Sequence, residues 1–150
     1  MMKTELVVFD IDGTLANNAH RVHYLQGVGK KDWDSFFALQ GADSPYENVV
    51  DLLNMYLARL EVHVAILTGR GEEWRGVTEE WLLGNDIDYH SLTMRPLGDR
   101  TDDNILKLNQ IQTWQDQGYN VIGLFDDRKR ICDAAREHGV TVFQMAAGEF

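Results

Sequence analysis

Apolar runs that end abruptly in polar residues, with helical patterns between them, constrain the fold of this chain more than any other feature. Four runs are clear: residues 6–10 (LVVFD), 62–69 (VHVAILTG), 121–127 (VIGLFDD) and 140–145 (VTVFQM). Residues 89–95 are a weaker fifth candidate. The first and third runs are almost continuous Val, Leu, Ile and Phe, which is typical of strands covered on both faces. Strands that alternate with helices predict an α/β fold with a doubly wound, mainly parallel, Rossmann-like sheet.

Helical periodicity follows the first predicted strand at some distance. Residues 44–60 open with Ser44 and Glu47 at the spacing of a capping box, and Pro45 stands at the first helical position. Apolar residues keep the helical period along this segment: Val49, Val50, Leu53, Tyr56, Leu57 and Leu60. We therefore predict a helix over the whole segment, with this face toward the sheet.

Two further helices are predicted in the second half of the chain. One begins at about Asp103 and stops at Gly118, and the other begins at about Lys129 and stops at Gly139. The first would carry four apolar residues on one side, namely Ile105, Leu108, Ile111 and Trp114. A short helix is also expected around residues 32–39.

Length and composition favour a single domain over residues 1–150, with a small cap or lid inserted at residues 17–43. The formal net charge of −10 disfavours an extended nucleic-acid track but not the grip of one phosphate. The single cysteine, Cys132, excludes an internal disulfide and fits a reducing cytoplasm. No apolar stretch approaches the roughly 18 residues of a membrane helix. Acids interrupt the N-terminal apolar run, so we expect no secretory signal there.

Three segments deliver polar residues to one edge of the predicted sheet. Asp10 and Asp12 share a face at the end of the first strand, because alternate strand residues point the same way. The other two segments end in Thr68-Gly69-Arg70 and in Asp126-Asp127. Doubly wound folds place their sites beyond the carboxyl ends of the strands. The candidate site therefore lies at this edge.

These residue types predict phosphoryl chemistry. The Asp10 carboxylate is the candidate nucleophile, because it can attack phosphorus when a cation screens the approaching charges. Mg²⁺ suits this task, since it takes oxygen ligands and leaves room for water and phosphate. We predict metal contacts from Asp10, Asp12, Asp126 and Asp127, with Asp12 acting through its backbone. The Asp12 side chain is the candidate general acid and base.

Two further residues are candidates for stabilising the phosphate. Thr68 offers a hydroxyl and a backbone N–H, and Lys107 offers a positive charge. Some of these residues also have a plain structural interpretation. Lys107 could be an exposed helix partner of Asp103. From the residues alone, Arg21 is a surface residue of the insertion. The common order of all the candidates along an alternating fold argues against coincidence.

The segments DIDGT (10–14) and LTGR (67–70), the helical Lys107 and FDD (125–127) together resemble the four motifs of the haloacid-dehalogenase-like hydrolases. Within that superfamily, residues 98–107 and 125–150 resemble the phosphatase domains of bacteriophage polynucleotide kinase/3′-phosphatases. The resemblance spans nearly the whole chain. The P-loop signature of the associated kinase domain is missing from this sequence, so we expect no kinase activity.

This resemblance implies a role for each matching residue. Asp10 would be the phosphorylated nucleophile and Asp12 the general acid–base, with Asp126 and Asp127 at the magnesium. Lys107 would neutralise the phosphate and Asp103 would orient Lys107. Three more positions would serve the phosphate and the substrate: Arg21, Gly69 and Arg70.

The resulting hypothesis is a magnesium-dependent phosphomonoesterase that works through an aspartyl-phosphate, acting on the 3′-phosphate of a nucleotide or polynucleotide end. One alternative keeps the chemistry but acts on 5′-(deoxy)nucleotides or another small phosphate ester. A second alternative is a receiver-like phospho-acceptor switch, which would not need the leaving-group acid Asp12. Four aromatic residues of the insertion either stack on a base or pack the insertion onto the core: Tyr24, Trp33, Phe36 and Phe37.

Overall fold

A five-stranded parallel sheet forms the centre of the computed structural model, which describes residues 3–148. Its strand order is β5-β4-β1-β6-β7, and every neighbouring pair runs parallel. The strands are β1 (Glu5–Phe9), β4 (Val62–Gly71), β5 (Ser91–Arg95), β6 (Asn120–Arg128) and β7 (Val142–Gly148). A separate pair, β2 (Ala16–Asn17) and β3 (Ser44–Pro45), is antiparallel. The predicted fold class and all five predicted strands are confirmed.

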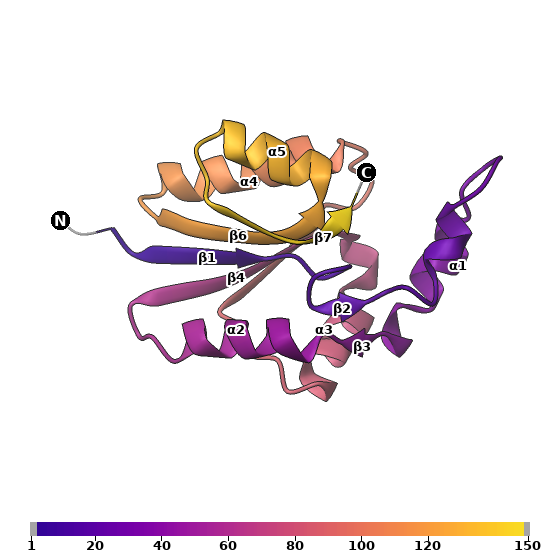
Figure 1. Cartoon of the computed structure of the whole chain (residues 1–150), viewed down its shortest axis with the longest axis horizontal. Helices are drawn as coiled ribbons and strands as arrows, with labels where there is room; N and C mark the ends of the chain where they lie inside the picture. The colour runs from indigo at the N-terminus through magenta and orange to yellow at the C-terminus, as the bar shows by residue number, and fades with distance from the viewer. Residues whose placement is uncertain (1–2, 149–150) are drawn as a thin grey trace.

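Helices cover both faces of the sheet (Figure 1). The helices of the described residues are α1 (Trp33–Ala38), α2 (Glu47–Leu57), α3 (Arg75–Gly84), α4 (Asp103–Asp116) and α5 (Lys129–Glu137), with short 3₁₀ turns η1 (Val22–Leu25), η2 (Gln40–Ala42) and η3 (Glu72–Trp74). In Figure 1, α4 and α5 lie above the sheet and α2 lies below it, while α1 stands beyond the ends of the strands. None of the helices within residues 3–148 is long and apolar enough to cross a membrane.

Two hydrophobic cores lie on opposite faces of the sheet. Val7 and Phe9 of β1 pack on the α2 and α3 side, and Leu6 and Val8 pack on the α4 and α5 side. This division follows from the alternation of side chains along a strand. All four residues are fully buried, and each such side chain contributes about 1.5–3 kcal/mol through burial. Because residues 6–9 are all apolar, β1 packs against a core on both faces of the sheet.

The helix predicted over residues 44–60 is shorter than expected. Ser44 and Pro45 form β3 against β2, and the Tyr46 N–H donates to the Leu15 carbonyl at 2.8 Å. The predicted capping box is therefore wrong, and α2 has no side-chain cap. Leu60 lies past the end of the helix and is 100% exposed, so its prediction as a core residue is also wrong.

The helix predicted from Asp103 is confirmed as α4, but its apolar side is narrower than predicted. Ile111 and Trp114 are buried, whereas Ile105 is 47% exposed. Helix α3 was not predicted from the sequence, because only Thr78, Trp81 and Leu82 of its ten residues are buried and the apolar periodicity is weak. The short helix expected around residues 32–39 is confirmed as α1.

Candidate active site

Three carboxylates gather at the carboxyl end of the sheet. Phe9 pairs in register with Phe125, so Asp10 and Asp126 come directly after a matched pair on neighbouring strands. Asp127 follows within β6. One oxygen from each of Asp10, Asp126 and Asp127 lies within 4.8 Å of the other two. All three residues are buried, and we call them the acidic group.

Lys107 extends from α4 into the acidic group. Its Nζ donates to Asp10 Oδ1 and to Asp126 Oδ2, each at 2.8 Å. The residue is 2% exposed, which rules out its interpretation as an exposed partner of Asp103. Burial disfavours its charge, but Asp10 and Asp126 outweigh that effect and raise the pKa of Lys107. Lys107 is therefore a fixed positive charge beside the candidate nucleophile.

The acidic group keeps more negative charge than Lys107 balances. Burial and the Asp126 carboxylate raise the pKa of Asp10 well above its ordinary value, against the opposing effect of Lys107. Burial and Asp126 also raise the pKa of Asp127 to about 6. Asp127 Oδ1 is buried and has no hydrogen-bond partner among residues 3–148. An orphaned carboxylate oxygen in an all-oxygen cluster fits a hard divalent cation such as Mg²⁺.

Gly13 makes room for this cluster. Its φ of +81° lies in the left-handed region, and a Cβ at this position would lie 2.1 Å from Asp127 Oδ2. A side chain at residue 13 would therefore both strain the backbone and push Asp127 out of the acidic group. The glycine of the Asp-x-Asp-Gly run is required by this close approach.

Asp12 is not a member of the acidic group, and two buried arginines hold it. Arg70 donates to it from Nε at 3.1 Å and from Nη2 at 2.8 Å, and Arg21 donates through Nη2. Burial alone would raise the pKa of Asp12, but Arg70 and Arg21 lower it to about 2. The Asp12 carboxylate is thus bound by two arginines, so any contact of Asp12 with a metal would come from its backbone.

Asp43, which was not predicted as a site residue, holds Arg21 in place. Asp43 Oδ1 accepts from Arg21 Nε at 2.8 Å, and Oδ2 accepts from Arg21 Nη2 at 2.6 Å. Its side chain is fully buried, and His20 Nε2 lies 2.6 Å from Oδ1. We call Asp12, Asp43, Arg21 and Arg70 the arginine clamp. The interpretation of Arg21 as a surface residue is wrong, because it is fully buried.

Asp43 left no signal in the sequence that pattern reading could use. It lies in the insertion, far from every motif, and resembles a loop aspartate between Ala42 and Ser44. A buried arginine needs a carboxylate partner, so knowledge that Arg21 is buried would have directed a search for one. That knowledge comes from the structure alone.

The remaining predicted residues surround these two clusters. Thr68 is 1% exposed and its hydroxyl accepts the Arg70 N–H at 3.1 Å. Asp103 is bound by Arg95 and Arg128 rather than by Lys107, so the expected orientation of Lys107 by Asp103 is not seen.

Gly69 lies beside Asp103. A Cβ at residue 69 would lie 2.8 Å from Asp103 Oδ1, and Arg95 Nε donates to the Gly69 carbonyl at 3.1 Å. Gly69 of β4 and Asp103 of α4 thus lie close together, and Arg95 of β5 binds both of them.

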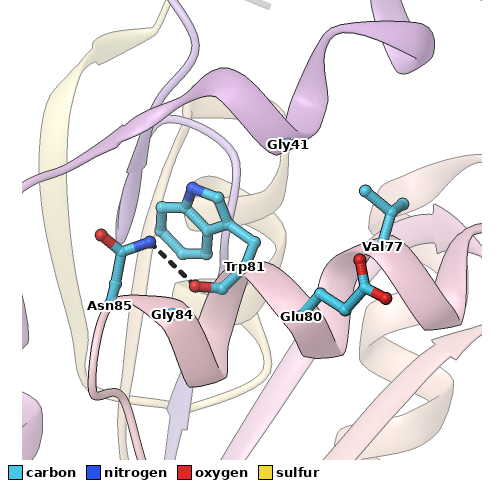
Figure 2. Close-up of a pocket in the computed structure, with 6 residues that line it drawn as sticks. All are labelled: Gly41, Val77, Glu80, Trp81, Gly84 and Asn85. Atoms are coloured by element: carbon cyan, nitrogen blue, oxygen red, sulfur yellow. Dashed lines mark hydrogen bonds between the residues drawn. The ribbon is translucent and has the colours of Figure 1, made fainter.

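Figure 2 shows a hollow against α3 that shares no residue with the acidic group or the arginine clamp. Gly41, Val77, Glu80, Trp81, Gly84 and Asn85 line it. Trp81 links the hollow to the site, because its Nε1 donates to the backbone carbonyl of Asp43 at 2.7 Å. Trp81 thus supports the backbone at Asp43. Among the residues that line the hollow, Glu80 alone carries a titratable side chain.

Comparison with known proteins agrees with this geometry. The family model described as the polynucleotide kinase PNKP phosphatase domain matches residues 4–150. A putative bifunctional polynucleotide kinase/RNA ligase of Autographa californica nuclear polyhedrosis virus is 32% identical over 124 residues, which make up 81% of this chain and 16% of the viral protein. The chain thus spans a small part of that relative's length.

Solved structures share the fold. A chain of the Pnkp1/Rnl/Hen1 complex is 30% identical, with a TM-score of 0.83 over 99% of this chain and 48% of that chain. The class C acid phosphatase from Bacillus anthracis is 16% identical, with a TM-score of 0.69 over 100% of this chain and 69% of that one. The second likeness concerns the fold alone.

Proposed function

This chain belongs to the family of polynucleotide kinase PNKP phosphatase domains, and from that premise we propose that it is a magnesium-dependent phosphatase that removes 3′-phosphates from nucleotide or polynucleotide ends. The observation that carries the proposal is a buried aspartate, Asp10, held by Lys107 inside an acidic group with an orphaned carboxylate oxygen. Membership of a phosphatase family sets aside the receiver-like switch.

We assign Asp10 as the nucleophile. Its carboxylate attacks the phosphorus, the bond from phosphorus to the ester oxygen breaks, and the phosphoryl group is carried on Asp10. Lys107 supports this step, because its ammonium beside Asp10 stabilises the charge on the phosphoryl oxygens. Asp10, Asp126 and Asp127 would hold the Mg²⁺, which when bound screens the negative charges of carboxylate and phosphate.

We assign Asp12 the proton transfers. It protonates the leaving ester oxygen and then accepts a proton from the water that attacks the phosphorylated Asp10. The two arginines favour its carboxylate form, which is the form that accepts the proton in the second step. For the first step, the negative charge of a substrate phosphate beside the same arginines would offset part of their effect and raise the pKa of Asp12.

The arginine clamp and the insertion would shape substrate binding. Arg21 and Arg70 fix Asp12 and supply positive charge to the phosphate, while Thr68 supplies a hydroxyl and an N–H. Residues 17–43, with η1 and α1, would form a small lid over the single domain. Since the viral relative is named a polynucleotide kinase/RNA ligase and the structural relative belongs to an RNA repair complex, RNA ends are candidate substrates beside DNA ends.

A phosphate-release screen tests the proposal. Matched 3′- and 5′-monophosphates of nucleosides and short RNA and DNA oligonucleotides are compared with Mg²⁺ present. We expect faster release from 3′-phosphates and little gain from lengthening the oligonucleotide. Equal or faster release from 5′-nucleotides would replace the 3′ assignment with the nucleotidase alternative, and would leave the chemistry assigned to Asp10 standing.

A further inference from the structure

A row of aromatic rings runs from the insertion to the edge of the sheet. Trp33 and Phe37 of α1 stack with their ring centroids 5.8 Å apart and their planes at 22°. Phe37 then stacks on Trp74 of η3, with centroids 5.9 Å apart and planes at 27°. Because η3 directly follows β4, this aromatic row joins the insertion to the strand that carries Thr68 and Arg70.

The aromatic row is coupled to the site through Arg21. The guanidinium of Arg21 lies 4.3 Å from the centroid of the Phe36 ring and donates to the Phe36 carbonyl at 3.1 Å. The same guanidinium donates to Asp12. Phe36 contacts Trp33 and Phe37 in turn, so a single arginine separates the general acid–base from these rings. In Figure 1, α1 stands beyond the carboxyl ends of the strands, where a substrate would approach.

Packing does not account for the whole row. Phe36 is 6% exposed and anchors α1, whereas Trp33 is 47% exposed. An indole of that size contributes little to a core when half of it faces water. The fold has thus placed a large flat side chain in solvent next to the site.

Two lysines precede Trp33 and can pair with a phosphate. Residues 13–31 contain Lys30 and Lys31 and no Asp or Glu, in a chain whose net charge is −10. Asp32 and Asp34 flank Trp33, and the Asp32 carboxylate accepts from the N–H and hydroxyl of Ser35. The Lys31 ammonium lies 5.7 Å from the centroid of the Trp33 ring. A flat ring with an ammonium beside it can bind a nucleotide, since bases stack on aromatic rings and lysines pair with phosphates.

We propose that Trp33, supported by Phe37 and Trp74, stacks on a nucleobase of a single-stranded nucleic-acid end whose terminal phosphate lies against Asp10. This inference deepens the proposed function and rests on it for the identity of the phosphate. Stacking reads the ring face that all four bases share, so the site tolerates any sequence. Lys31 would turn from the Trp33 ring to a phosphate of the bound strand.

The test uses the full chain carrying Asp10→Asn, so that ligands bind without turnover. Dissociation constants are measured by calorimetry, with Mg²⁺, for nucleoside 3′-monophosphates and for glycerol 2-phosphate, which has no base. We expect Trp33→Ala to weaken nucleotide binding about tenfold and to leave glycerol phosphate binding unchanged. Trp33→Phe should restore most of the nucleotide affinity. Leu39 is an exposed apolar residue next to α1. Leu39→Ala is therefore the matched control, and it should change the dissociation constant of neither ligand.

Three outcomes would overturn the stacking site. The first is an equal loss of affinity for both ligands in Trp33→Ala, which would mean general damage to the fold. The second is an unchanged nucleotide affinity in Trp33→Ala. The third is a parent chain that binds the nucleotide no more tightly than glycerol phosphate. Failure of the proposed function is distinguished by a separate measurement: if the wild-type chain hydrolyses neither 3′- nor 5′-nucleotides, the proposed function fails, while the base-dependent binding still decides the role of Trp33.

Discussion

The acidic group and the arginine clamp are two buried charge clusters side by side in one site, and they are balanced in opposite ways. The acidic group sets three carboxylates against the one ammonium of Lys107. The clamp sets two carboxylates against two guanidiniums. Burial raises the cost of any uncompensated charge, so the first cluster favours additional positive charge, whereas the second is already balanced.

This difference assigns different tasks to the two clusters. Under the proposed function, the cluster that is short of positive charge would bind a cation and a phosphate, and its carboxylates would be the reacting and ligating groups. A self-neutral cluster with bidentate hydrogen bonds fixes geometry, because each arginine fork is held by a planar carboxylate. Mutations in the two clusters should therefore fail in different ways.

The largest effect should come from the nucleophile. Asp10→Asn removes the attacking carboxylate, so phosphate release in Mg²⁺ should fall to the uncatalysed background. Asp12→Asn, in the clamp, should retain metal binding and lose about 10²–10⁴-fold in kcat, because the proton transfer is removed while the acidic group stays intact. Near-normal turnover by Asp10→Asn, or by the wild-type chain in EDTA, would contradict the assigned chemistry.

Lys107 should have the next largest effect. Lys107→Ala removes the charge that faces the phosphoryl oxygens, so kcat should fall about 10²–10³-fold with a smaller change in KM. Thr68→Ala should show the same pattern with a smaller loss, since it removes one neutral hydroxyl. Steady-state kinetics separate the two parameters. A pure KM effect in either variant would make that residue a ground-state binder.

Asp43→Asn should break the clamp while sparing the acidic group. Loss of the charge partner of buried Arg21 should lower stability by about 3 kcal/mol and kcat about tenfold or more, because Arg21 no longer holds Asp12. Mg²⁺ should still raise the Tm of this variant, whereas it should not raise the Tm of Asp127→Asn, which loses a proposed metal ligand. Asp34→Asn, an exposed acid on α1, is the control. A normal kcat in Asp43→Asn would show that the clamp does not position Asp12.

The acidic group was largely predictable from the sequence and the clamp was not. Asp10, Asp126 and Asp127 each end a buried strand, and parallel strands end at a common edge, so local pattern and topology together bring them close. Lys107 is four residues into a predicted helix, and its direction depends on how α4 packs on the sheet. Periodicity does not distinguish an inward lysine from an exposed one.

Apart from its short helix α1, the structure of the insertion was not predicted, for a related reason. Between residues 17 and 43 the chain has no long period, and its structure depends on contacts made at a distance, such as Arg21 with Asp43. Ser44 and Pro45 satisfied the local rules for starting a helix, yet pairing with Ala16 and Asn17 took precedence and delayed the helix to Glu47. Tertiary hydrogen bonds outweighed a local cap.

The smallest expected effect concerns salt, and it tests whether positive charge beyond the clamp binds a nucleic-acid backbone. Several arginines surround the site, but acids accompany them: Asp103 binds Arg95 and Arg128, and Asp102 lies 3.9 Å from Arg130. An arginine that is already paired with an aspartate neutralises little phosphate charge, so few counterions are released when the nucleic acid binds. The slope of log K against log salt for a 3′-phosphorylated oligonucleotide should therefore be shallow, about −1 to −2. Lys31→Ala should make the slope shallower by less than about 1, since one lysine neutralises at most one phosphate. A slope near −5 in the wild-type chain would mean that the arginines leave their acids for phosphates.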